Sequence, residues 1–447
     1  MKKAPSPFVS LMPIIVLVLL LFATIRTFGS DALSGGSQVS LLTTTAICIL
    51  IGMVFYKIPW KDYELAITNN IAGVATAIII LLIIGALSGI WMISGVVPTL
   101  IYYGMQIIHP SFFLASTCII CALISVMTGS SWTTIATIGI ALMGIGKAQG
   151  FEDGWIAGAI ISGAYFGDKI SPLSETTILA SSITDTPLFR HIRYMMITTV
   201  PSLVITLIIF TVAGFSHDAN NTQHIAEVAT ALNEKFHITP WLLIVPVATG
   251  ILIAKKVPSI VTLFLSTLLA AVFALIFQPD LLEEISGIAA SGFDSLFKGL
   301  MMTIYGETNL HTDNAVLTDL IATRGMSGMM NTIWLILCAM CFGGAMTASG
   351  MVGSITSIFV RFMKKTVSVV SATVCSGLFL NLTTADQYIS IILTGNMFRD
   401  IYAKKGYESC LLSRTTEDAV TVTSVLIPWN SCGTVSYTHL RAHETRS

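Results

Sequence analysis

Long apolar stretches follow one another along most of the chain, separated by short polar segments. Six of them are Phe8–Ile25, Ser40–Phe55, Ile71–Val97, Ser111–Met127, Met195–Phe215 and Val257–Phe277. Each is close to the ~20 residues that cross a bilayer as an α-helix. On that criterion we count about ten to twelve membrane segments. The pattern therefore predicts an all-α polytopic membrane protein, with the first stretch as a membrane helix and not a cleaved signal peptide, because no clean small-residue cleavage site follows it.

Two apolar stretches are interrupted by small and polar residues instead of ending there. The first interruption is Thr128–Ser131, and the second is Asn381–Gln387. Asp168 follows the first by about 40 residues (168 minus 128), and Asp418 follows the second by about 34 (418 minus 384). Matched interruptions in two halves are typical of inverted-repeat transporters with broken helices. We therefore predict one transporter domain over 1–434, with repeats at roughly 70–215 and 290–434.

Composition and charge agree with a membrane protein. The chain has 447 residues, of which 54% are hydrophobic and only 11% charged, whereas soluble domains carry about 25% charged residues. A net charge of −1 gives no reason to expect a nucleic-acid partner. Short basic segments, beginning with Lys2 and Lys3, predict a cytoplasmic N-terminus by the positive-inside rule. The eight cysteines lie mostly in apolar stretches, where they are predicted to pack as small apolar residues.

The segment GDKISPLSETT, residues 167–177, places charged and hydroxyl groups between apolar flanks. Pro172 lacks a backbone N–H and interrupts the helix. Irregular backbone at membrane depth is tolerated only where it is buried in protein or lines a watery cavity. The side chains that make this segment rich in oxygen are Asp168, Ser171, Ser174, Glu175, Thr176 and Thr177. We expect Asp168 or Glu175 to bind a hard cation with these oxygens, or a proton instead, since burial disfavours an ionised carboxylate.

Structural roles for the same residues remain open. Asp168 can be a helix cap at a membrane edge, with Lys169 reaching the headgroups, and Glu175 can form an ion pair with Lys169. In the second half, Asp386 is either a helix cap or an intramembrane functional carboxylate. Arg414, Glu417 and Asp418 share a helix face by their spacing, which also suits an internal ion pair.

GDKISPLSETT, with TGSSW upstream and TADQY and IPWNSCG downstream, resembles the NhaC family of Na+/H+ antiporters. The resemblance runs from the N-terminus to about Gly433, and the family includes malate/Na+-lactate antiporters. It implies a multi-pass transporter of the bacterial inner (plasma) membrane, with broken helices and re-entrant hairpins. The ion- or substrate-binding residues that it implies are Asp168, Ser171, Ser174, Glu175, Thr176, Ser130, Thr384, Asp386 and Asn430. Among these, Asp168 and Asp386 are the expected ligands of Na+.

The resemblance implies exchange of Na+ for H+ by alternating access. The alternative is a Na+- and H+-coupled exchanger of organic acids such as malate or lactate. Apart from the transported Na+ and H+ we expect no cofactor, and the expected surroundings are the lipid bilayer, with a homo-oligomer left open. An intramembrane enzyme is not supported, because Asp168 lacks the G-x-G-D string and no H-E-x-x-H string occurs.

The segment 435–447, VSYTHLRAHETRS, departs from the family pattern. It is polar and matches no membrane segment, whereas the resemblance implies a further apolar helix here. We therefore expect it to be a non-native read-through tail that is not packed, and we leave His439, Arg441 and His443 out of the site.

Overall fold

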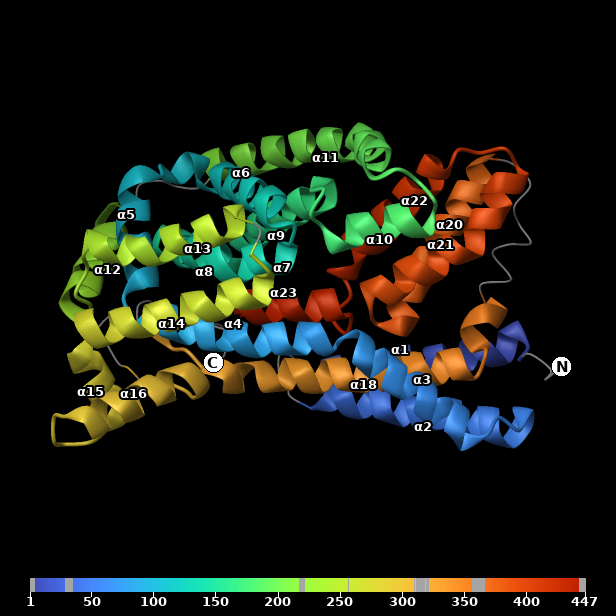
Figure 1. Cartoon of the computed structure of the whole chain (residues 1–447), viewed down its shortest axis with the longest axis horizontal. Coiled ribbons are helices and arrows are strands. Elements are labelled where there is room, and N and C mark those ends of the chain that lie inside the picture. The colour runs from blue at the N-terminus through green and yellow to red at the C-terminus, as the bar shows by residue number, and fades with distance from the viewer. Residues whose placement is uncertain are drawn as a thin grey trace. The chain divides into compact units, whose positions relative to one another are not determined.

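The computed structural model describes residues 5–28, 35–216, 222–255, 257–308, 310, 318, 321–355 and 366–441. These residues form helices and no strand, so the predicted all-α class is confirmed (Figure 1). The helices before residue 188 are α1 Pro7–Phe28, α2 Gly36–Tyr56, α3 Trp60–Gly73, α4 Ala75–Ile93, α5 Val96–Ile107, α6 Pro110–Thr128, α7 Ser131–Thr134, the π-helix η2 Ile135–Gly139, α8 Ile140–Ala148, α9 Asp153–Ile170 and α10 Glu175–Ile183. The later helices are α11 Leu188–Ser216, α12 Thr222–Lys235, η3 Pro240–Leu243, α13 Ile244–Ala254, α14 Ser259–Phe277, α15 Pro279–Ser286, α16 Phe293–Tyr305, η4 Gly325–Met329, α18 Met330–Ala348, α20 Thr366–Thr384, α21 Gln387–Lys404, α22 Ser409–Ser424 and α23 Ser431–Arg441.

Eight helical stretches of the described residues are long and apolar enough to cross a membrane. A ninth arises if the bent pair Ala229–Lys235 and Pro240–Ala254, with 94° between its halves, is one span. The 29-residue helix α11 exposes large apolar side chains such as Ile197, Ile205 and Ile208, as lipid-facing helices do. The prediction of a polytopic membrane protein is therefore confirmed. The sequence count of about ten to twelve segments compares with the eight or nine candidate spans among the described residues.

The chain divides into two compact units, and the division falls inside GDKISPLSETT. The Asp168 unit comprises Ile79–Ser174, Met196–Met330 and Ser436–Ser447. The Asp386 unit comprises Met1–Ile78, Glu175–Met195 and Asn331–Val435. Each unit contains one of the two interrupted stretches.

In the Asp168 unit, α6 and α9 pack closely along their lengths. Two glycines of α9, one turn apart, permit this approach. A Cβ atom added at Gly163 would lie 2.1 Å from the carbonyl oxygen of Cys118, and one added at Gly167 would lie 2.4 Å from that of Ala122. Small residues spaced in this way let membrane helices come close, and here they hold the end of α9 beside the end of α6.

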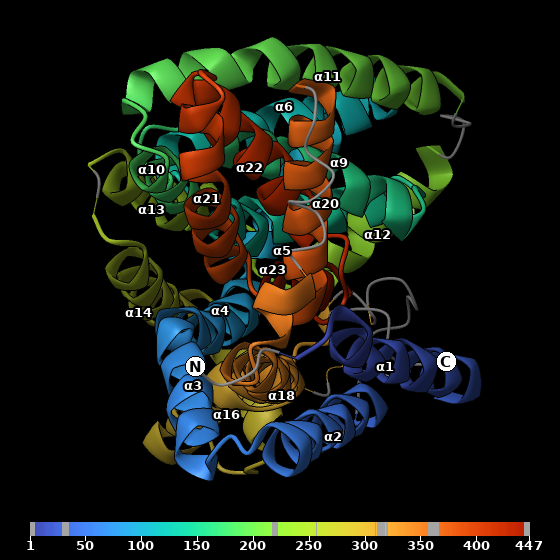
Figure 2. The same ribbon diagram turned by 90° about the vertical axis from the view of Figure 1, so that its right-hand side faces the viewer.

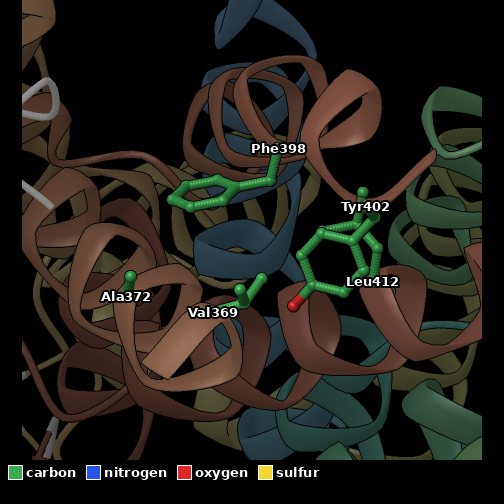
Figure 3. Packing of buried hydrophobic residues seen from close by; sticks show 5 residues of the cluster. All are labelled: Val369, Ala372, Phe398, Tyr402 and Leu412. Atoms are coloured by element: carbon green, nitrogen blue, oxygen red, sulfur yellow. The ribbon is translucent and has the colours of Figure 1, made fainter. Parts of the chain in front are cut away.

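In the Asp386 unit, α20, α21 and α22 pack side by side, as Figures 1 and 2 show. An apolar cluster joins them near the turn between α21 and α22, and Figure 3 shows its five buried members, Val369, Ala372, Phe398, Tyr402 and Leu412. A second group, Ala180, Ile391 and Val420, packs α10 against α21 and α22. These contacts fix α10 and the start of α21 in one unit.

The segment after Gly433 differs from the expectation. Helix α23 continues to Arg441, and Val435, Ser436 and Leu440 are buried. The expectation of an unpacked segment is therefore wrong for these residues, because Ser436 and Leu440 lie four residues apart on one face of the helix and both are buried. Residues 442–447, including His443, lie outside the described residues.

Candidate functional site

The interruption after α6 is a tight, hydrogen-bonded turn. Gly129 has φ 67°, a left-handed conformation that ends α6, and its N–H bonds the Ser125 carbonyl. Ser130 then caps α7 by accepting a hydrogen bond from the Thr133 N–H (3.2 Å). Thr128 holds both sides of the turn, since its Oγ1 accepts from the Ser130 N–H (3.1 Å). The polar sequence TGSS is thus explained by backbone groups that would otherwise lack partners at membrane depth.

Asp168 lies beside this turn, on the last turn of α9. Ser131 Oγ donates to Asp168 Oδ2 over 2.7 Å, and Asp168 is only 6% exposed. The alternative in which Lys169 reaches the headgroups is wrong, because Lys169 is also only 6% exposed. The structure therefore places a buried carboxylate against a serine hydroxyl at a helix break.

The hydroxyl of Ser171 has a structural task. It donates to the carbonyl oxygen of Val126 (2.8 Å) and accepts from the N–H of Leu173 (3.2 Å). Ser171 thereby ties the end of α9 to the end of α6. The hydroxyl of Ser171 is thus hydrogen-bonded to backbone groups, whereas the hydroxyl that donates to Asp168 belongs to Ser131.

The interruption after α20 has the same construction in the Asp386 unit. Ala385 has φ 57°, in the left-handed region, and Asp386 caps α21 by accepting from the Ile389 N–H (2.9 Å). Thr384 holds both sides of this turn, with its Oγ1 3.1 Å from the Asp386 carbonyl oxygen. Asp386 is therefore a helix cap, as one reading of the sequence proposed.

Capping uses only one oxygen of Asp386. Ser431 Oγ donates to the other, Oδ2, over 3.0 Å, and Asp386 is 2% exposed. Asn430, fully buried at the second break, holds α23 in place by donating to the Asn381 carbonyl (3.3 Å) and accepting from the Cys432 N–H (3.1 Å). The second buried carboxylate thus also has a serine donor.

The two breaks share hydrogen bonds at positions 256 residues apart (384 minus 128). In the first pair, Ser125 Oγ donates to Ala164 O (2.5 Å) and, at the offset positions, Asn381 Nδ2 donates to Val420 O (2.7 Å). Two pairs lie within the turns: Thr133 N to Ser130 Oγ (3.2 Å) matches Ile389 N to Asp386 Oδ1 (2.9 Å), and Thr134 Oγ1 to Ser130 O (3.0 Å) matches Ser390 Oγ to Asp386 O (2.7 Å). In the last pair, Ser131 Oγ donates to Asp168 Oδ2 (2.7 Å), and the offset residues are joined by Ser424 Oγ donating to Gln387 Oε1 (3.3 Å). One arrangement of backbone and hydroxyl contacts therefore occurs in both units, with the carboxylate at different points of it.

The remaining predicted residues are divided between the units. Ser174 is buried in the Asp168 unit, whereas Glu175 and Thr176 begin α10 of the Asp386 unit. Glu175 is exposed and accepts a hydrogen bond from Tyr388 of α21 (3.0 Å). The sequence prediction missed Ser131 and Ser431, although each adjoins a residue that it named.

The ligand chemistry of these sites is simple. Within the described residues, no three His, Cys, Asp or Glu side chains converge as metal ligands. Each buried aspartate accepts a hydrogen bond from a neutral hydroxyl, Ser131 for Asp168 and Ser431 for Asp386. One carboxylate with neutral oxygen donors suits a monovalent hard cation or a proton.

Comparison with known proteins gives consistent results. The model of the Na+/H+ antiporter family matches residues 163–447. The Na+/H+ antiporter NhaC of Bacillus subtilis is 35% identical over 394 residues, covering 88% of this chain and 84% of the relative. The malate-2H+/Na+-lactate antiporter of the same organism is 36% identical over 398 residues, covering 89% and 82%. NhaC of Alkalihalophilus pseudofirmus is 37% identical over 390 residues, covering 87% and 81%.

Proposed function

Because this chain belongs to the Na+/H+ antiporter family, we propose that it is a secondary active antiporter that exchanges Na+ for H+ across the bacterial inner membrane by alternating access. One observation carries the proposal. Two helix breaks each hold a buried aspartate that accepts a hydrogen bond from a serine, Ser131 to Asp168 and Ser431 to Asp386. Ionisable groups buried in membrane segments are costly and mark ion or proton pathways.

The chemistry of exchange follows from competition at a carboxylate. A carboxylate that binds Na+ must give up its proton, and a carboxyl group that takes up a proton no longer attracts the cation. Ser131 and Ser431 can serve both states, because a hydroxyl donates to a carboxylate and its oxygen can also face a cation. Asp168 and Asp386 are therefore the proposed shared carriers, as expected from the sequence.

The repeated hydrogen bonds support a duplicated architecture. We infer that residues 110–177 and 366–433 are copies related by the 256-residue offset. The turns that lead into α9 and α22 match as well. Gly150 and Gly406 have φ 83° and 72°, and Glu152 and Glu408, directly before α9 and α22, have nearly equal backbone angles. Both intervals, 110–177 and 366–433, lie within the predicted repeats and form the core of the proposed inverted repeat. From the basic segments we propose a cytoplasmic N-terminus.

The second candidate is Na+- and H+-coupled exchange of organic acids. It is favoured by the relative named as a malate-2H+/Na+-lactate antiporter, which is as similar to this chain as the relatives named NhaC. Both functions use buried carboxylates for Na+ and H+. They differ in whether an organic anion accompanies the ions.

Purified protein in proteoliposomes tests the proposal. An imposed Na+ gradient should move protons in the opposite direction, measured by a pH-sensitive dye inside the vesicles, and malate and lactate should leave the rate unchanged. Proton movement that requires either acid would favour the second candidate. A Na+ gradient that moves no protons under any of these conditions would contradict both.

A further inference from the structure

The interior of the Asp386 unit contains a row of buried polar groups beyond Asp386 itself. Along α22, Ser413, Glu417, Thr421 and Ser424 occur at spacings of four, four and three residues, so they share one face of the helix. All four are fully buried. A stretch of buried helix is normally apolar, so this face calls for a partner of polar chemistry.

Helix α21 presents a matching row. Gln387 and Thr394 lie two turns apart on one face, and both are buried. Ser424 Oγ donates to Gln387 Oε1 (3.3 Å), which joins the two rows at the end near Asp386. We call these six residues the polar lane: Gln387, Thr394, Ser413, Glu417, Thr421 and Ser424.

The connection between α21 and α22 aligns the rows. The two helices are joined by the short segment 405–408 and pack against each other, so they run in opposite directions. Seven residues after Gln387 is Thr394, and seven residues before Ser424 is Glu417, so both lie about 10 Å along their helices from the first pair. A Cβ added at Gly377 of α20 would lie 2.9 Å from Val420 Cγ2 and 3.8 Å from Thr394 Oγ1, which places Thr394 against the interior between α20 and α22.

Two groups of the polar lane are unsatisfied. Among the described residues, the hydroxyls of Thr394 and Thr421 are fully buried and make no hydrogen bond. Buried hydroxyls usually have a hydrogen-bond partner, and an exception can be explained by an ordered water, an ion or a functional role. The carboxyl group of Glu417 lies on the same face of α22, one turn from Thr421.

The ends of the polar lane differ. At one end, Gln387 directly follows Asp386. Toward the other end, the apolar cluster of Figure 3, with Phe398, Tyr402 and Leu412, fills the space between the helices. Ser413 there contacts a buried histidine, with His191 Nδ1 2.8 Å from Ser413 Oγ.

The inferred copy in the Asp168 unit lacks most of this chemistry. At the 256-residue offset, the counterparts of Thr394, Glu417 and Thr421 are Ile138, Ile161 and Tyr165. The counterparts of Gln387 and Ser424 are Ser131 and Asp168, which retain a polar contact. The lane is therefore not a requirement of the helix arrangement, because the same arrangement forms with isoleucine in place of Thr394 and Glu417 and tyrosine in place of Thr421.

We propose that Glu417 binds a proton and that the polar lane carries this proton between Glu417 and the break at Asp386. The inference rests on the proposed Na+/H+ exchange. When Na+ binds at Asp386, the proton leaves its carboxyl group, passes over the hydroxyls of Ser424 and Thr421, and binds the carboxylate of Glu417, which then releases it to the solution. At each hydroxyl one O–H bond forms as another breaks, so the hydroxyls are restored, and the positive charge of Na+ replaces that of the proton at Asp386.

The other charged groups on the helices packed around Glu417 are Glu175, Arg399, Asp400, Lys404, Arg414 and Asp418. The first four are exposed. Arg414 and Asp418 pair with each other at 4.0 Å on a less buried face of α22. Among these groups and His191 at Ser413, Glu417 is the fully buried carboxyl group.

The test compares two fluxes in proteoliposomes. Na+-driven proton movement needs the proton route, whereas exchange of isotopically labelled Na+ for Na+ does not. Glu417→Gln should reduce the first flux by about 100-fold and leave the second near the wild-type rate. Asp418→Asn is the matched control, because it removes the neighbouring carboxylate of the same helix, and both fluxes should remain.

Thr421→Val tests the lane without changing a charge. It replaces a hydroxyl by a methyl group, and it should slow proton movement while Na+/Na+ exchange remains. Wild-type proton movement in Glu417→Gln or in Thr421→Val would overturn the proposal. Loss of both fluxes in a monodisperse Glu417→Gln protein would also overturn it, since Glu417 would then be needed for Na+ itself. A wild-type protein that moves Na+ but no protons would instead contradict the proposed function.

Discussion

The left-handed turn at each break allows a prediction with a calculated magnitude. Gly129 has φ 67°, and a Cβ added there would lie 2.6 Å from the carbonyl carbon of Leu173 and 2.7 Å from its Cβ. Gly129→Ala therefore adds a left-handed alanine, which costs about 1–2 kcal/mol, and an overpacked methyl group, which costs about 1–3 kcal/mol. Because alanine makes the unfolded chain less flexible than glycine does, the substitution also stabilises the protein by about 0.4–1 kcal/mol. The net loss of stability should be about 1–5 kcal/mol.

Ala385→Gly is the matched control at the second break. Ala385 already holds its methyl group at φ 57° in a fully buried position. Its replacement by glycine relieves about 1–2 kcal/mol of backbone strain and loses a similar amount through the more flexible unfolded chain and the lost methyl burial. Its stability should stay within about 1 kcal/mol of the wild type.

Unfolding of the purified variants in detergent, followed by tryptophan fluorescence against denaturant, measures both effects. We expect a clear loss of stability for Gly129→Ala and almost none for Ala385→Gly. The explanation of the two turns would be refuted if Gly129→Ala unfolded like the wild type, or if Ala385→Gly were the less stable of the two.

Two further predictions concern single side chains. Ser131→Ala removes the donor to Asp168 and should raise the KM for Na+ about 10-fold, whereas Ser171→Ala breaks the tie between α9 and α6 and should lower the melting temperature with little change in KM. Equal effects of both on KM would contradict this division. The Cys410 thiol and then Arg190 lower the pKa of Glu408 from its ordinary value of 4.5, so its carboxylate stabilises the fold above that value, and the contribution disappears as the pH falls through the lowered pKa. Glu408→Gln should therefore melt below the wild type at neutral pH but equally in acid, and a difference that grew in acid would show the opposite sign.

The broken helices could be predicted from the sequence because their signal is local. Polar and small residues inside apolar stretches mark places where backbone groups need partners, and both predicted interruptions, at Thr128 and Thr384, are helix ends. The buried state of Asp168 and Asp386 followed from the same reasoning. The structure bears out their placement at breaks.

Other features depended on contacts that spacing alone does not reveal. The sequence matched Asp168 with Asp418, since both are carboxylates after a break, but the shared hydrogen bonds place Ser424 at the position of Asp168. Glu417 was grouped with Arg414 and Asp418, although a helix face defined by spacing leaves open which neighbour is buried. The structure shows that Arg414 pairs with Asp418, whereas Glu417 is fully buried. Ser171 was expected among ion ligands because a hydroxyl gives no sign of whether it faces a cation or a carbonyl.

Proton release on Na+ binding tests the central claim most directly, because a carboxyl group shared by Na+ and H+ must lose its proton when the cation binds. Purified protein in weakly buffered detergent solution, with a pH-indicator dye, is titrated with NaCl, and choline chloride serves as the control salt. We predict that the wild type acidifies the solution on addition of Na+ alone, and that Asp168→Asn and Asp386→Asn each release fewer protons. Wild-type proton release by both variants would contradict the assignment of the two aspartates as the shared carriers.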